Sequence, residues 1–94
     1  MDIDPILLEV MRNSLYTITD EMMGALIRTS YSTNIKDRRD CSCSLFLPDR
    51  RVVAQSEMSA TPLHLATLVA SVPTILDAIP PSEMNPGDHI IYNK

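Results

Sequence analysis

The hydrophobic positions of the first thirty residues follow the period of an α-helix. Apolar residues recur at spacings of three and four, which places them on one helical face: Leu7, Met11, Leu15, Ile18, Met22 and Leu26. Asp4 can accept a hydrogen bond at the helix cap, and Pro5 fits the first helical turn. The pattern predicts a helix from Pro5 to about Thr29. At roughly 1.5 Å per residue it would be about 40 Å long, so we expect it to belong to a larger domain.

The next segment changes to the period of a β-strand. Polar and apolar residues alternate over residues 41–47, which is typical of a strand with one apolar face. The Pro-Asp-Arg sequence at residues 48–50 favours a turn, and residues 51–55 have the composition of a returning strand. These two segments therefore predict a β-hairpin.

A second helix and a third strand are expected in the last third of the chain. Apolar residues are again spaced for a helix at Leu68, Val72, Ile75 and Ile79. Proline is tolerated only in a first helical turn, so Pro73 places the predicted start near Val69. Residues 89–92 are apolar and follow a Pro-Gly-Asp turn, which predicts a terminal strand. The expected fold is α+β. A terminal strand needs a neighbour for its backbone, so we expect a larger domain that is truncated here.

Composition narrows the range of functions. Six methionines and no tryptophan predict a core of aliphatic side chains and methionine, including Met11, Met22 and Met23. The net charge is -4 and the basic residues form no stripe, which argues against a nucleic-acid partner. No apolar run is long enough to span a membrane and the N-terminus is acidic, so a cytoplasmic protein is predicted. Cys41 and Cys43 are expected to be reduced core residues.

Asp40 is the most informative candidate residue. It ends a run of five charged residues, 36–40, between the predicted long helix and the first strand. An acid in this position is either paired with Arg38 or Arg39, or presented into a cavity where its charge can act. Both interpretations remain open from the residues alone.

Five segments of the chain, in this order, resemble the N-terminal region of the hydantoinase B/oxoprolinase family. They are DPILLEVMRNSL, IRTSYSTNIKDRRDCSCSLF, RRVVAQSE, TPLHLATLVASV and PGDHIIYN. The family includes the B subunit of N-methylhydantoinase, the C-terminal half of 5-oxoprolinase, and the α subunits of acetone and acetophenone carboxylases. Its members run to several hundred residues. The resemblance therefore implies that residues 1–94 are the N-terminal portion of an incomplete domain.

The resemblance also implies a chemistry. In this family a hydantoinase A-type subunit or domain uses ATP to phosphorylate the substrate oxygen, and the half represented here completes the reaction. Several members do so at a divalent metal, zinc or manganese in the complete parent. In the family, the motif that matches Arg38-Arg39-Asp40 supplies a metal ligand, and the resemblance therefore implies that Asp40 is this ligand. Arg39 is expected either to hold Asp40 in position or to bind a carboxylate of the substrate. His64 matches a common family histidine and is expected either to transfer protons in the cleft or to pack at a helix entrance.

The other metal ligands implied by the resemblance lie beyond this sequence. They follow an Asn-Asp-Pro sequence that would start at Asn93, which is itself a candidate for supporting the substrate or a ligand. The chain is therefore expected to be the N-terminal fragment of an ATP-dependent cyclic-amide hydrolase. Alone, the 94 residues are expected to hold no cofactor and to be inactive. The hydrolase is expected to be an oligomer. The alternatives are a non-catalytic protein that pairs through its long helix, and a fragment of an acetone or acetophenone carboxylase α subunit. Relatives often have glycine at the turn position of Arg50, which leaves the turn type open.

Overall fold

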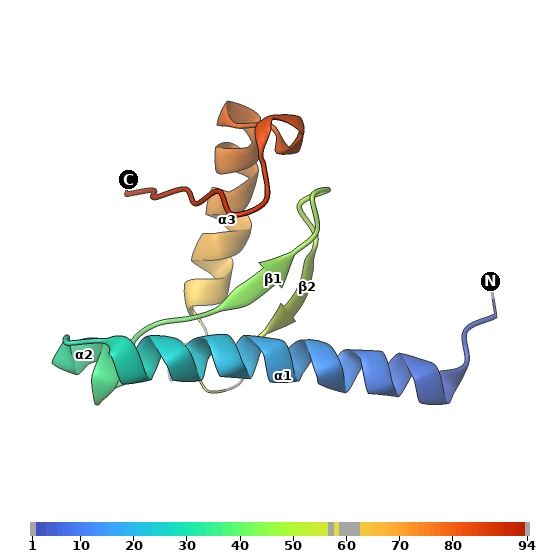
Figure 1. Cartoon of the computed structure of the whole chain (residues 1–94), viewed down its shortest axis with the longest axis horizontal. Coiled ribbons are helices and arrows are strands. Elements are labelled where there is room, and N and C mark those ends of the chain that lie inside the picture. The colour runs from blue at the N-terminus through green and yellow to red at the C-terminus, as the bar shows by residue number, and fades with distance from the viewer. Residues whose placement is uncertain (1, 57, 59–62, 94) are drawn as a thin grey trace.

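The computed structural model describes residues 2–56, 58 and 63–93, and it has the expected α+β architecture. The elements are α1 (Pro5–Thr29), α2 (Thr33–Lys36), β1 (Ser44–Phe46), β2 (Val52–Gln55), α3 (Leu63–Ala78) and the 3-10 helix η1 (Pro81–Glu83). Figure 1 shows α1 along the base of the molecule, α3 standing across it, and the β1–β2 hairpin rising from α1 beside α3. The molecule measures 46 × 32 × 25 Å, and its long dimension follows α1.

Helix α1 has the predicted bounds because its ends are set by local chemistry. Asp4 Oδ1 accepts a hydrogen bond from the backbone N–H of Ile6 at 2.9 Å, and Pro5 occupies the first turn. The helix ends at Thr29, since Ser30 has extended backbone angles. The expected cap and the expected length are both confirmed.

The hairpin is confirmed, with shorter strands than the alternation predicts. Strands β1 and β2 are antiparallel and pair Ser44 with Gln55, Leu45 with Ala54, and Phe46 with Val52. The register shifts between the last two pairs, which forms a β-bulge on β2. Residues 41–43 precede β1 as extended chain, although the bond from the Ser56 N–H to the Cys43 carbonyl continues the pairing at 2.9 Å.

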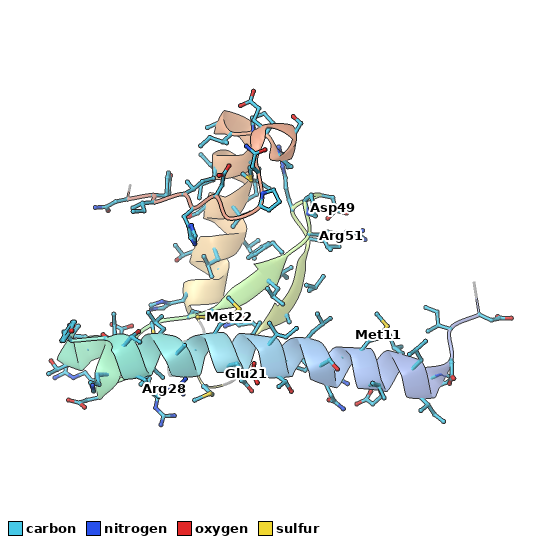
Figure 2. All side chains as sticks on the ribbon, viewed as in Figure 1. Met11, Glu21, Met22, Arg28, Asp49 and Arg51 are labelled. Carbon is cyan, nitrogen blue, oxygen red and sulfur yellow. The ribbon has the colours of Figure 1, made fainter. Side chains whose placement is uncertain are left out.

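The hairpin turn contains a strained residue. Arg50 has a φ of 78°, the left-handed region that favours glycine, which costs a side-chain-bearing residue about 1–2 kcal/mol. The guanidinium of Arg50 pairs with Asp77 on α3, and Asp49 accepts a 2.7 Å hydrogen bond from Arg51 (Figure 2). This hydrogen bond from Arg51 lowers the pKa of Asp49. The ion pair with Asp77 therefore ties the strained turn to α3.

The core lies where α1 meets the hairpin. Thr19 and Met23, one helical turn apart on α1, are 0% exposed, and Cys41 and Ala54 are also buried. The thiol of Cys41 lies 3.6 Å from the Met23 sulfur, and burial, followed by the Asp40 charge, raises the Cys41 pKa. A raised thiol pKa keeps the group protonated, as the core interpretation of this cysteine requires.

The prediction that the apolar stripe of α1 forms the core is wrong for most of its length. Met11 is 55% exposed and Met22 is 39% exposed (Figure 2), whereas Met23 is buried. The hairpin covers the face that carries Thr19 and Met23, which is turned around the helix axis from the stripe. A periodic pattern shows that a helix has an apolar face, but the element packed against it decides which residues are buried.

Helix α3 begins earlier than predicted. It starts at Leu63 rather than near Val69, so Pro73 lies in its interior and His64 is helical rather than extended. An interior proline removes one backbone hydrogen bond. Val72 and Leu76, on either side of this proline, line an apolar hollow together with Phe46 and other hairpin residues. Pro62, part of the expected extended approach to His64, lies outside the described residues.

The predicted terminal strand is not formed. Residues 89–93 are extended, but the sheet in the described part of the chain contains β1 and β2 only. The segment lies against α3 instead, where Ile90 and Tyr92 line a hollow together with Val72 and Ile75 (Figure 1). A strand requires a neighbour for its backbone, and here the neighbouring element is a helix. Within the described residues, no helix combines the length and the apolar character that crossing a membrane requires.

The exposed apolar face of α1 predicts self-association. Ile6 is 76% exposed, Leu7, Val10 and Met11 are more than half exposed, and this half of the helix extends past the hairpin (Figure 1). Exposed apolar surface of this kind favours association. We expect light scattering after size-exclusion chromatography to give a mass that rises with concentration. The double variant Leu7→Lys, Met11→Lys should restore the monomer mass, and a wild-type chain that is monomeric at all concentrations would contradict the prediction.

Candidate functional site

Two of the predicted site residues lie in direct contact. His64 Nε2, in the first turn of α3, is 3.0 Å from Asp40 Oδ1, which follows the end of α2. Their side chains are 37% and 53% exposed, so both are accessible from outside the molecule. An imidazole N–H can donate to a carboxylate oxygen at this distance. Among the described residues, the side chain that contacts the Asp40 carboxylate is therefore that of His64, and not that of Arg38 or Arg39.

The end of α2 fixes the position of Asp40. The Asp40 N–H donates to the Asn34 carbonyl at 2.9 Å, and the Arg39 N–H donates to the Ile35 carbonyl at 3.0 Å. Arg39 has a φ of 55°, the left-handed conformation that glycine usually takes where a helix ends. An arginine in this conformation is strained by about 1–2 kcal/mol. Residues held in this way cluster at functional sites, and this one sets the direction in which Asp40 leaves the helix.

His64 also lines an open hollow of about 250 Å³. The other described residues that line it are Ser42, Thr67 and Leu68. Gln55 Nε2 donates to Ser42 Oγ at 3.4 Å, which links this wall of the hollow to β2. The hollow thus combines an imidazole with two hydroxyl groups and one apolar side chain. The sequence gives no signal for Ser42 or Thr67, because serine and threonine are common on any surface.

Asn93 and Arg39 are the other two predicted site residues. Asn93 lies next to this hollow. The position of Arg39 is set by the hydrogen bond of its backbone N–H to the Ile35 carbonyl. Asn93 lines a second hollow of about 360 Å³ that shares Thr67 and Leu68 with the first, so the two hollows adjoin. The Arg39 guanidinium forms no ion pair with a carboxylate of the described part of the chain. The structure therefore brings Asp40 and His64 together and places Asn93 in a hollow that adjoins the one lined by His64.

Asp40 and His64 could supply part of a metal site. A carboxylate and an imidazole are ligands that zinc and manganese accept. The 3.0 Å separation of their donor atoms is compatible with one ion held by both, since metal bonds of about 2.1 Å place neighbouring ligands about 3.0–3.4 Å apart. Within the described residues there is no cluster of three or more His, Cys, Asp or Glu side chains. A catalytic ion normally draws on about three protein ligands, so further donors are needed.

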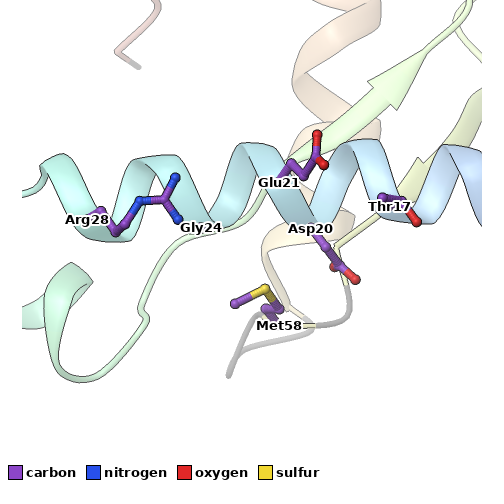
Figure 3. A pocket seen from close by; sticks show the side chains of 6 residues that line it. All are labelled: Thr17, Asp20, Glu21, Gly24, Arg28 and Met58. Carbon is purple, nitrogen blue, oxygen red and sulfur yellow. The ribbon is translucent and has the colours of Figure 1, made fainter.

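A different hollow lies along α1. It has a volume of about 560 Å³ and is lined by Thr17, Asp20, Glu21, Gly24 and Arg28 of α1, with Met58 (Figure 3). Arg28 folds back along the helix, and its Nη1 is 3.3 Å from where a Gly24 side chain would begin. Asp20 accepts a 2.8 Å hydrogen bond from the buried Ser56 hydroxyl, which attaches the end of β2 to α1. None of the predicted site residues lines this hollow, so we place the candidate site at Asp40 and His64.

Comparisons with known proteins agree with the resemblance of the sequence. The Hydantoinase B/oxoprolinase family model matches residues 4–94. A 5-oxoprolinase of Dictyostelium discoideum is 42% identical over 76% of this chain and 6% of its own length. A 5-oxoprolinase of Saccharomyces cerevisiae is 34% identical over 99% of this chain and 7% of its own length. An uncharacterized protein of Methanocaldococcus jannaschii is 36% identical over 96% of this chain and 16% of its own length.

The chain thus spans a small part of the length of these relatives. No solved structure matches it. The match of the family model over nearly the whole sequence, together with relatives of 34–42% identity, identifies the chain as a member of the hydantoinase B/oxoprolinase family.

Proposed function

We propose that this chain contributes the first part of the catalytic site of an ATP-dependent cyclic-amide hydrolase of the 5-oxoprolinase or N-methylhydantoinase type. The observation that carries the proposal is the contact between Asp40 and His64, the second of which lines a small hollow. Family membership and the 5-oxoprolinases among the relatives supply the reaction class. The remainder of the site is contributed by further residues of the complete domain.

The proposed roles follow from the chemistry of ring opening. An amide carbonyl is a poor electrophile, so a hydantoinase A-type subunit or domain first uses ATP to phosphorylate the substrate oxygen. A divalent ion, zinc or manganese, when bound, polarises the reacting carbon–oxygen bond and provides hydroxide near neutral pH. Asp40 helps to hold this ion, and His64 transfers a proton. Arg39 binds a substrate carboxylate through its guanidinium, and Asn93 hydrogen-bonds to the substrate or to a ligand.

A second candidate function rests on the exposed apolar face of α1. A protein that pairs with another subunit through α1, without chemistry of its own, would present such a face. The two candidates differ in what Asp40 does. In the hydrolase it is required for turnover, whereas in the pairing protein its replacement leaves the interaction through α1 unchanged. We propose a cytoplasmic location for the hydrolase, since the ATP that it uses is intracellular.

The isolated chain should show no ATP-dependent ring opening. It supplies two potential metal ligands at the candidate site and has no Gly-rich nucleotide-binding sequence, with two glycines in all. We expect turnover of 5-oxoproline or a hydantoin only when the chain is joined to the remaining residues of a hydantoinase B domain and combined with an A-type partner. Loss of the cyclic amide and release of phosphate are measured together. Turnover by the purified 94-residue chain with ATP would overturn this assignment.

A further inference from the structure

We propose that the N-terminal half of α1 is a contact surface for a second copy of this chain, and that the two helices pack antiparallel. This surface, the α1 contact face, consists of five large apolar side chains: Ile3, Ile6, Leu7, Val10 and Met11. A second copy is then the occupant of the surface on which the second candidate function rests, whatever the chemistry at Asp40 and His64.

The α1 contact face lies on the part of the helix that the rest of the molecule leaves uncovered. Each of its five side chains is more than half exposed, and Ile6 is the most exposed of them. Figure 1 shows the hairpin and α3 over the C-terminal half of α1, so that the N-terminal half projects past them. Met11, labelled in Figure 2, lies on this projecting half.

The α1 contact face is one-sided and carries no charge. At about 100° per residue, its four side chains within α1 span an arc of about 140°, a width that one partner helix can cover. Leu8, which is also exposed, lies outside this arc. Glu9 and Arg12 are the only charged residues from Pro5 to Thr19, and they lie on the other side of the helix, 3.7 Å apart. The surface therefore favours an apolar partner over a charged one.

The area of the α1 contact face is sufficient for a weak dimer. Five large side chains, each more than half exposed, present roughly 600 Å² per copy, so two copies bury about 1,200 Å² in all. Specific interfaces between proteins begin at about this size. We therefore expect a dimer that forms as the concentration rises and dissociates on dilution.

The antiparallel direction follows from charge and from the shape of the molecule. Asp2 and Asp4 lie at the N-terminal end of α1, so a parallel pair would bring the carboxylates of both copies together. A parallel pair would also place both hairpins and both α3 helices beside the same stretch of the helix pair. In an antiparallel pair these parts lie at opposite ends, because they are confined to the C-terminal half of α1 (Figure 1).

An antiparallel pair centred between residues 8 and 9 matches the α1 contact face with itself. Leu7 of one copy then faces Val10 of the other, and Ile6 faces Met11. The arrangement is two-fold symmetric, so each of these contacts occurs twice and the interface closes with two copies. Ile6 does not face its own equivalent, because the two are about 7 Å apart along the helix axes as well as being on separate helices.

Disulfide trapping tests this direction in the 94-residue chain. We expect Ile6→Cys and Met11→Cys to form few cross-linked dimers alone and many when mixed, since a disulfide needs Cα atoms within about 7 Å. Intact mass identifies the mixed species. The parent chain, with Cys41 and Cys43, is the blank, and Glu9→Cys mixed with Met11→Cys is the matched control on the other side of the helix. Efficient cross-linking of Ile6→Cys with itself would mean a parallel pair and would overturn the proposal.

A charge exchange tests the same contact without a covalent bond. Leu7→Lys and Val10→Glu should each be monomeric alone, since each places a charge in the apolar interface. Mixed in equal amounts they should recover the dimer mass in light scattering, because lysine on one copy then faces glutamate on the other. A mixture of Leu7→Lys with Leu7→Glu should stay monomeric. Both positions are exposed in the monomer, so circular dichroism at low concentration should be unchanged.

Failure of this proposal can be distinguished from failure of the proposed hydrolase function. A parent chain that is monomeric at all concentrations, or a dimer that Leu7→Lys leaves intact, would eliminate the α1 contact face. Neither result concerns Asp40, which follows α2 beyond the other end of α1. Conversely, Asp40→Asn should leave the dimer unchanged, whether or not it affects turnover in the complete domain.

Discussion

Replacing Asp40 with asparagine should abolish metal binding and turnover together when the chain is joined to the rest of a hydantoinase B domain. Asparagine keeps the size of the side chain but removes the negative charge that offsets a divalent ion. We expect at least a 10–100-fold loss of metal affinity, about the effect of removing a ligand's support, and a parallel fall in kcat/KM. Metal content by mass spectrometry and initial rates of ring opening, measured on the same preparations, test this.

Arg38→Lys is the matched control for this prediction. It alters a neighbouring charged residue, but it keeps the positive charge and leaves both Asp40 and the left-handed position at Arg39 intact. We expect metal content and turnover to change by less than about twofold, because exposed charged side chains contribute about 1 kcal/mol or less. Circular dichroism should be the same for both variants. An Asp40→Asn enzyme with full metal content and activity would show that Asp40 serves only as the hydrogen-bond partner of His64.

The elements that could be predicted from the sequence are those fixed by neighbouring residues. Asp4 and Pro5 mark the start of α1 because a cap and a first turn involve residues two to four positions apart. The hairpin follows from a turn sequence between two short runs with strand composition. The strain at Arg50 was also open to prediction, since the family resemblance implies glycine at this turn position and Arg50 adopts a positive φ.

The elements that could not be predicted depend on what packs against them. Met11, Met22 and Met23 look equivalent in the sequence, and only the placement of the hairpin buries Met23. Pro73 predicts a late start for α3, yet the helix is continuous through this proline from Leu63 to Ala78. Residues 89–92 have the composition of a strand but lie beside α3, where they find no strand to pair with.

The residues of the candidate site could be predicted from the sequence, but the contact between them could not. Asp40 and His64 are each candidates from the sequence, but their contact joins the end of α2 to the start of α3, and the sequence does not predict α2, which ends where the charged run begins. The left-handed position after α2, where glycine is usual, is occupied by Arg39. Local sequence therefore gave no sign of the motif that directs Asp40 toward His64.

Met23→Ala should cause the largest loss of stability of any single truncation in α1. Met23 is fully buried between α1 and the hairpin and contacts the Cys41 thiol. Truncating a buried methionine removes apolar contacts and leaves a cavity, which costs about 2–5 kcal/mol. We expect the urea midpoint of the chain to fall sharply, or the folded state to be lost, when unfolding is followed by circular dichroism at low protein concentration. Met23→Leu keeps most of the volume and should cost less than about 1.5 kcal/mol.

Met11→Ala tests the same substitution on the exposed stripe. Met11 is 55% exposed, so in the monomer its truncation should change the free energy of unfolding by less than about 0.5 kcal/mol. The same variant should weaken self-association, because it removes apolar surface from the face that we expect to pair. A loss of stability equal to that of Met23→Ala at low concentration would mean that the stripe is buried even in the monomer, and that the original pattern had identified the core correctly.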